Sequence, residues 1–190
     1  RGDGPYPLDI FSHGAYGIRF QSVFYTVPLA SHGYVVASID HTGNVLYDLL
    51  AADGYNLDDM VLSALDRPYD AVMTTTLMTT RNETPGDPLE GMIDPLQIGI
   101  SGHSFGGFTS LVTAMIDPRI KAAVPQAPAS GFLGVMGYDL ADFPCPVMLQ
   151  GSSLDGTLDP AVELIPAYGK LPSPKFFFEL KTGGHFTYSD

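Results

Sequence analysis

Ile98-Gly99-Ile100-Ser101-Gly102-His103-Ser104-Phe105-Gly106-Gly107 joins an apolar run that is typical of a strand to the five-residue motif G-x-S-x-G. In this motif the chain turns so sharply from strand to helix that only glycines fit on either side of the serine. Residues 108–115 are typical of a helix that begins at the turn, so its first N–H groups would point at an anion formed beside Ser104. We therefore predict that Ser104 is a nucleophile. The alternative is a tight glycine turn in which the serine is incidental.

A serine nucleophile needs a general base, and His185 is the candidate. It is the only histidine after Ser104 in the chain. It follows a strand-like run, residues 176–180, and the pair Gly183-Gly184, whose flexibility would let the imidazole reach over the end of a sheet. The alternative is a loop histidine that hydrogen-bonds to the backbone.

The acid that orients the base is expected between the serine and the histidine in chain order. The strand-like run 146–151 lies there, and the loop after it contains Asp155 and Asp159. We prefer Asp155, because it comes first after the strand and is followed by a glycine. Asp159 precedes Pro160 and a predicted helix, which is typical of an N-cap residue. Both aspartates remain candidates at this point.

An oxyanion hole would take one backbone N–H from Phe105, the residue after the nucleophile. The second donor is expected in the loop Ser12–Gly17, which follows the strand-like run 8–11, and there we predict the N–H of Ala15. We expect His13 to support this loop rather than to titrate in catalysis. The remaining histidines are also predicted to be structural: His32, His41 and His103.

Candidate substrate contacts come from two segments. Residues 129–143, rich in glycine and large apolar side chains, lie between two predicted strands on the catalytic side, and Phe132 and Met136 are candidates there. Tyr16, next to Ala15, is the third candidate. The alternative for residues 129–143 is an ordinary excursion that packs over the sheet.

Composition limits the class of partner. The chain has 190 residues, 45% hydrophobic and 16% charged, which indicates a globular protein. A net charge of −12 disfavours a nucleic-acid or anionic-membrane partner, and no apolar run approaches the length of a transmembrane helix. The single cysteine, Cys145, excludes an internal disulfide and a cysteine-based zinc site. We expect no cofactor, no metal and no stable membrane insertion. A soluble protein is expected, either secreted, periplasmic or cytoplasmic, and the oligomeric state stays open.

Strand and helix signals alternate along the chain, which predicts a mostly parallel sheet with helices on both faces. The active site of such a sheet lies at the carboxyl ends of its strands, where all the residues named above are expected. Residues 44–64 are expected to be irregular, with a short helix near 58–64. Strands are predicted at 8–11, 34–39, 97–101, 122–124, 146–151 and 176–180, and helices at 22–31, 70–80, 108–115 and 161–168.

Together these motifs resemble the α/β-hydrolases, in particular platelet-activating-factor acetylhydrolases and their bacterial dienelactone-hydrolase-like relatives. The residues that carry the resemblance are FSHG at 11–14, LASHGYVVASIDHTGN at 29–44, RPYDAV at 67–72, IDPLQIGISGHSFGG at 93–107 and GGHFTYSD at 183–190. The resemblance implies a three-layer fold, Ser104 as nucleophile, His185 as base, and Ala15 and Phe105 as oxyanion donors.

The chain departs from that family in two ways. In the animal acetylhydrolases the acid follows the strand after the elbow helix, but here that place is Pro125-Gln126-Ala127-Pro128, without a carboxylate. This favours Asp155 and argues against narrow phospholipid specificity. The superfamily's first two strands are also missing, so we expect one catalytic domain over residues 1–190 that is cut at both ends.

The predicted function is hydrolysis of carboxylic esters, small or polymeric, through a Ser-His-Asp triad and an acyl-enzyme. A first alternative is a polyester or cutin-type hydrolase with an open cleft, suggested by a short chain with little room for a lid. A second is a non-catalytic binding module that keeps the fold, and a third is an acyltransferase. The intact set of serine, aspartate and histidine argues against the binding module.

Overall fold

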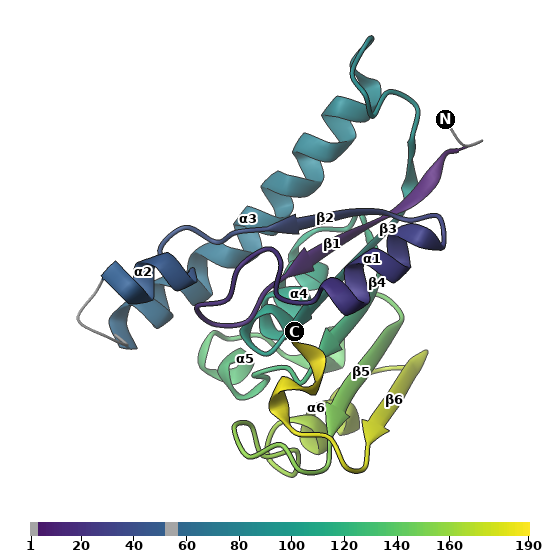
Figure 1. Ribbon diagram of the computed structural model, residues 1–190. Helices are drawn as coiled ribbons and strands as arrows, with labels where there is room; N and C mark the ends of the chain where they lie inside the picture. The colour runs from purple at the N-terminus through teal and green to yellow at the C-terminus, as the bar shows by residue number, and fades with distance from the viewer. Residues whose placement is uncertain (1–3, 52–56) are drawn as a thin grey trace.

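The computed structural model describes residues 4–51 and 57–190, and in this part of the chain six strands form one sheet (Figure 1). The strand order is β2-β1-β3-β4-β5-β6, and every neighbouring pair is parallel. The mostly parallel sheet expected from the alternating pattern is therefore confirmed. The strands are β1 (Tyr6–Ser12), β2 (Val35–Ile39), β3 (Ile93–His103), β4 (Ile120–Gln126), β5 (Val147–Ser152) and β6 (Lys175–Leu180).

The helices lie on both faces of the sheet. The β1–β2 connection moves one way along the sheet and the β3–β4 connection moves the other way, so right-handed crossovers place their helices, α1 and α4, on opposite faces. Figure 1 shows α1 in front of the sheet and α4 behind it. The helices are α1 (Val23–Ser31), α2 (Leu46–Ala51), α3 (Leu57–Glu83), α4 (Phe105–Ile116), α5 (Gly131–Val135) and α6 (Leu164–Lys170), with 3₁₀ turns η1 (Leu140–Asp142) and η2 (His185–Tyr188).

This order reverses direction between β1 and β3, and the carboxyl ends of these two strands adjoin. Such a switch point leaves a crevice, because the loops after the two strands run to opposite faces. The loop after β1 contains Ala15, and the turn after β3 contains Ser104. The topology therefore brings the predicted nucleophile and the predicted oxyanion loop to one place.

The core lies between the sheet and the pair α3 and α4, which pack against each other. Helix α4 is buried over almost its whole length, since it covers β3 and β4. No helix in the described ranges is both long enough and apolar enough to cross a membrane. The fully buried large apolar side chains of the core include Leu8, Ile10, Ile98, Ile100, Phe108 and Leu111.

The structure corrects the expectation for residues 44–80. Helix α3 is continuous from Leu57 to Glu83, where we expected a short helix, a break and a second helix. Pro68 lies inside it, because tertiary packing against α4 outweighs the local cost of a proline. Helix α2 occupies part of the segment expected to be irregular, and residues 52–56 of that segment lie outside the described residues.

A second correction concerns the helix expected at 161–168. Helix α6 begins only at Leu164, and the residues between Pro160 and Glu163 form a turn. Asp159 Oδ1 accepts the N–H of Ala161 at 2.8 Å within this turn. The Asp159 side chain therefore binds a backbone N–H of the turn and not of helix α6, whose N-cap is Glu163. The prediction that Asp159 is the N-cap of the helix was wrong.

Candidate active site

Ser104 occupies the sharp turn between β3 and α4 with φ 57° and ψ −115°. A non-glycine residue with positive φ is strained, and such strain persists only where the surroundings impose it. The neighbouring glycines are required by space: a Cβ at Gly102 would lie 2.5 Å from the Ser12 carbonyl oxygen, and a Cβ at Gly106 would overlap the same atom. The sequence pattern and the backbone therefore agree on a nucleophile elbow.

His185 and Asp155 complete a chain of hydrogen bonds that begins at Ser104. The Ser104 hydroxyl lies 2.9 Å from His185 Nε2, and His185 Nδ1 lies 2.7 Å from Asp155 Oδ2. Because a carboxylate only accepts, Nδ1 carries the proton and Nε2 is left to accept from the serine. The histidine and the aspartate are 5% and 7% exposed, so solvent competes little for these bonds.

The acid loop after β5 and the base loop after β6 are joined by their backbones. Ser153 N–H donates to Leu180 O at 2.9 Å, and Leu154 N–H donates to Gly183 O at 3.1 Å. Asp155 is oriented further by two backbone donors, Thr157 N–H at 2.9 Å and Leu158 N–H at 2.8 Å, which both bind Oδ1. The other carboxylate oxygen is thereby directed at the histidine. Of the two candidate acids, only Asp155 contacts His185, whereas the Asp159 side chain is exposed.

Sequence reasoning did not identify Gln21, which lies between the oxyanion loop and the elbow. Its Oε1 accepts the Gly14 N–H at 2.5 Å, and its Nε2 donates to His103 Nδ1 at 2.7 Å. The His103 ring in turn donates from Nε2 to the main-chain oxygen of His185 at 2.9 Å. Burial, followed by repulsion from His185, lowers the pKa of His103 to about 4, so the ring is neutral and can fill both roles. No local pattern marks Gln21, because its partners are remote in sequence.

The two predicted oxyanion donors belong to the turn after β3 and to the loop after β1. Phe105 is the first residue of α4, where the N–H has no partner within its own helix and the helix dipole favours an anion. Ala15 is exposed in the loop after β1. The backbone of that loop is fixed at Gly14, because His13 Nδ1 donates to Gly14 O at 2.6 Å and Gln21 Oε1 accepts the Gly14 N–H.

The histidines expected to be structural have protein partners. His13 and His41 are fully buried; His41 bonds Ser12 Oγ at 2.8 Å and Asp70 Oδ2 at 2.7 Å. Burial, reinforced by the charge of Arg67, lowers the pKa of His13 to about 3 and that of His41 well below its usual value. Neither ring therefore carries charge near neutral pH.

The three candidate substrate contacts are all half-buried and pack against the core. The Phe132 ring lies 6.2 Å from the ring centres of both Phe105 and Phe108. Tyr16 has a positive φ of 52° within the loop Ser12–Gly17. Met136 is the C-cap residue of helix α5. Phe132 thus packs against the residue that carries a predicted oxyanion donor, which connects the segment 129–143 to the elbow.

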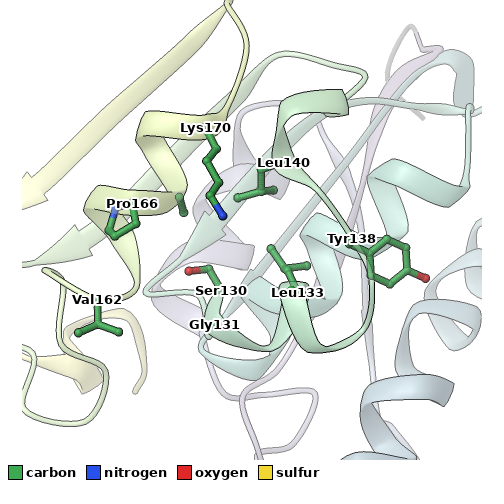
Figure 2. A pocket seen from close by; sticks show the side chains of 10 residues that line it. Ser130, Gly131, Leu133, Tyr138, Leu140, Val162, Pro166 and Lys170 are labelled. Atoms are coloured by element: carbon green, nitrogen blue, oxygen red, sulfur yellow. The ribbon is translucent and has the colours of Figure 1, made fainter.

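A cavity of about 150 Å³ opens between α5, η1 and α6 (Figure 2). It is walled by Leu133, Leu140 and Val162, and the Lys170 ammonium points into it. Neither Phe132 nor Met136 lines it, so the segment 129–143 forms a wall of this cavity through other side chains.

Comparison with known proteins identifies related chains. The family model described as PET hydrolase-like matches residues 16–190. Cutinase est2 from Thermobifida alba is 27% identical over 188 residues, which are 98% of this chain and 55% of that protein. A bis(hydroxyethyl) terephthalate hydrolase from Streptomyces coelicolor is 27% identical over 187 residues, 97% of this chain and 52% of that protein. A platelet-activating factor acetylhydrolase from Cavia porcellus is 25% identical over 154 residues, 65% of this chain and 35% of that protein.

These matches confirm the predicted resemblance to the platelet-activating-factor acetylhydrolases, while the dienelactone-hydrolase part of it stays a prediction. The chain spans about half the length of the cutinases that it matches. The order of elements, the elbow and the family model agree over residues 16–190. This chain therefore belongs to the PET hydrolase-like family of the α/β-hydrolase superfamily.

Proposed function

We propose that the protein is a serine hydrolase that cleaves carboxylic esters through an acyl-enzyme. The observation that carries the proposal is the unbroken hydrogen-bond chain Ser104 Oγ, His185 Nε2, His185 Nδ1, Asp155 Oδ2, with distances of 2.9 and 2.7 Å. It starts from a serine whose backbone is held in a strained conformation. Such strain costs folding free energy, and a binding module would have no reason to retain it together with a complete triad.

In the proposed acylation step, His185 Nε2 takes the hydroxyl proton while Ser104 Oγ attacks the ester carbonyl. The carbonyl oxygen becomes an anion beside Ser104, where the N–H groups of Ala15 and Phe105 are the proposed donors. Asp155 stabilises the imidazolium, which then gives its proton to the departing alcohol. Water, activated by the same histidine, attacks the acyl-enzyme and releases the acid.

The proposed substrates include diol esters of aromatic acids and polyesters. This extension rests on the PET hydrolase-like family and on relatives named as cutinases and a bis(hydroxyethyl) terephthalate hydrolase. The Ser104 side chain is partly exposed rather than enclosed, which suits a substrate that arrives as a long chain. The polyester reading is thus a narrower form of the ester hydrolase proposal.

The test combines covalent labelling with turnover. A fluorophosphonate probe is expected to modify Ser104, as mapped by mass spectrometry, and Ser104→Ala is expected to abolish hydrolysis of p-nitrophenyl butyrate and bis(hydroxyethyl) terephthalate. Ser31→Ala is the matched control: Ser31 Oγ lies 3.3 Å from His32 Nδ1 on the surface, but without an acid or an elbow. Labelling at Ser31, or turnover by folded Ser104→Ala protein, would refute the proposal.

A further inference from the structure

Arg67 of helix α3 is buried in the core, and no carboxylate of residues 4–51 or 57–190 forms a hydrogen bond with its guanidinium. It is 1% exposed, and burial lowers its pKa to about 9, which leaves it charged near neutral pH. Its hydrogen-bond partners within the described ranges are neutral oxygens: Asn44 Oδ1, Ser12 Oγ, the His13 carbonyl and Thr109 Oγ1. Removing a guanidinium from water is costly unless every donor finds a partner. A group retained at that cost is a candidate for a positional role.

The partners of Arg67 fall on two sides of the candidate active site. On one side its Nη2 donates to the hydroxyl of Ser12, at 3.1 Å, and to the carbonyl of His13. On the other side its Nε donates to Thr109 Oγ1 at 3.2 Å, and its guanidinium lies 4.7 Å from the ring centre of Phe105. The first pair begins the loop that carries Ala15, and the second pair belongs to α4.

Besides the bond from Arg67 to the His13 carbonyl, further hydrogen bonds restrain the loop Ser12–Gly17, which contains the predicted oxyanion donor Ala15. The His13 ring donates from Nδ1 to Gly14 O at 2.6 Å and accepts the His41 N–H at Nε2 at 3.2 Å. The Gly14 N–H is taken by Gln21. Arg67 is the member of this set that also reaches α4, so it couples the loop to the elbow helix.

We propose that Arg67 is a positioning residue that holds the N–H groups of Ala15 and Phe105 at the separation needed to bind the oxyanion. The inference rests on the proposed function, since it concerns the same serine hydrolase reaction. Such sites tolerate displacements of only about 0.5 Å, and loss of one donor typically costs about 10²–10³ in kcat. Displacement of a donor that remains present should cost less, about tenfold to a hundredfold.

The variants are Arg67→Met, which removes all five donors, and Arg67→Lys, which keeps the charge but not the planar fork. Thr109→Val is a milder variant that removes the acceptor on α4, together with the hydrogen bond that Thr109 Oγ1 donates to Phe105 O at 2.9 Å. Arg119→Met is the matched control. Arg119 also connects α3 to the chain beside α4, through Thr76 Oγ1 at 3.0 Å and Asp117 Oδ2 at 2.6 Å, but at the far end of α4.

The readout compares two inhibitors of nearly the same shape. An alkyl trifluoromethyl ketone adds to Ser104 Oγ, with the proton passing to His185, and the new oxyanion must be bound. The corresponding trifluoromethyl carbinol cannot form that adduct. We expect Arg67→Lys and Thr109→Val to lose ketone affinity in proportion to kcat/KM, about tenfold or more, with carbinol affinity and KM unchanged. Arg119→Met should lose stability without either change.

Equal losses of ketone and carbinol affinity, or unchanged kcat/KM in folded Arg67→Lys protein, would overturn the inference. An equal loss of activity in Arg119→Met would overturn it too, because general destabilisation of the fold would then be enough to explain the loss of activity. If Arg67→Met does not fold, Arg67→Lys and Thr109→Val decide the outcome alone. Failure of the proposed function is distinguishable, because the unaltered protein would then show no Ser104-dependent turnover at all.

Discussion

His103 donates a hydrogen bond from Nε2 to the main-chain oxygen of His185 at 2.9 Å, so the residue before the candidate nucleophile holds the backbone of the candidate base. The two rings lie 4.7 Å apart between centres. Gln21 fixes the other nitrogen of His103 and, through Gly14, the oxyanion loop. One neutral imidazole therefore connects the three loops that meet at the switch point of the sheet.

His103→Phe should both misplace the base and destabilise the fold. The change leaves the His185 carbonyl and the Gln21 amide nitrogen without their His103 partner, at a cost of about 1–3 kcal/mol each where they stay dry. We expect a drop in kcat/KM of about tenfold or more for p-nitrophenyl butyrate. His103→Gln is the control, since its amide can still donate to the carbonyl. Equal activity of the two folded variants would contradict this role.

Asp155→Asn should lower kcat by about four orders of magnitude, as expected when an amide holds the base in the wrong tautomer. The measurement is steady-state turnover of p-nitrophenyl butyrate, with the fold checked by circular dichroism. The fold should survive, because the amide oxygen can still accept the N–H groups of Thr157 and Leu158.

Asp159→Asn is the matched control, the same substitution four residues along the same loop. Its side chain is exposed and binds only the Ala161 N–H within the turn, which an amide oxygen can also accept. We expect turnover close to that of the unaltered protein. A large loss in Asp159→Asn, together with a small one in Asp155→Asn, would transfer the role of acid to Asp159.

The rate of acylation should be lower in acid than near neutral pH, because only a neutral imidazole can accept the Ser104 proton. Burial keeps the pKa of His103 at about 4 and that of His13 at about 3, so neither ring adds a second ionisation near neutral pH. Single-turnover acylation with a neutral ester measures the step directly. A rate independent of pH from about 5 to 9 would argue against a histidine base.

Asp9→Asn should stabilise the fold at alkaline pH. Burial raises the pKa of the Asp9 carboxyl to about 6, although the Ser101 hydroxyl, which donates to it at 2.6 Å, opposes part of the shift. Because the folded-state pKa lies above the ordinary value of 3.8, the stability linked to Asp9 is complete below that value and is lost as pH rises through about 6. An asparagine does not ionise and can still accept from Ser101, so it avoids the loss.

Urea unfolding of Asp9→Asn measures this effect. The gain in the free energy of unfolding should be about 1–3 kcal/mol at about pH 8 and should vanish near about pH 4. Asp66→Asn, at an exposed position on α3, should show no such pH-dependent gain. The same gain at both pH values would mean that the pKa of Asp9 in the folded protein is not raised above its value in the unfolded chain.

Features that depend on a few adjacent residues could be predicted from the sequence. The elbow at Ser104 follows from local sterics, since two glycines and a serine between an apolar strand and a helix admit few backbone conformations. The parallel sheet follows from alternating short strands and helices. The candidate base needed only the absence of any other histidine after Ser104. The course of α3 through Pro68 was missed, because packing against α4 overrides the local preference.

The sequence by itself determined the elbow, the class of sheet and the identity of the candidate nucleophile and base. The first three follow from short-range backbone geometry, and the base follows from there being one histidine after Ser104. Only the tertiary structure distinguished Asp155 from Asp159 as the residue that contacts His185, since the two share a loop and the histidine lies 30 residues after Asp155 in the chain. The roles of Gln21 and Arg67 also emerged only there. Their partners lie as far as 82 residues away, and the strand register and helix packing that bring them together leave no local pattern.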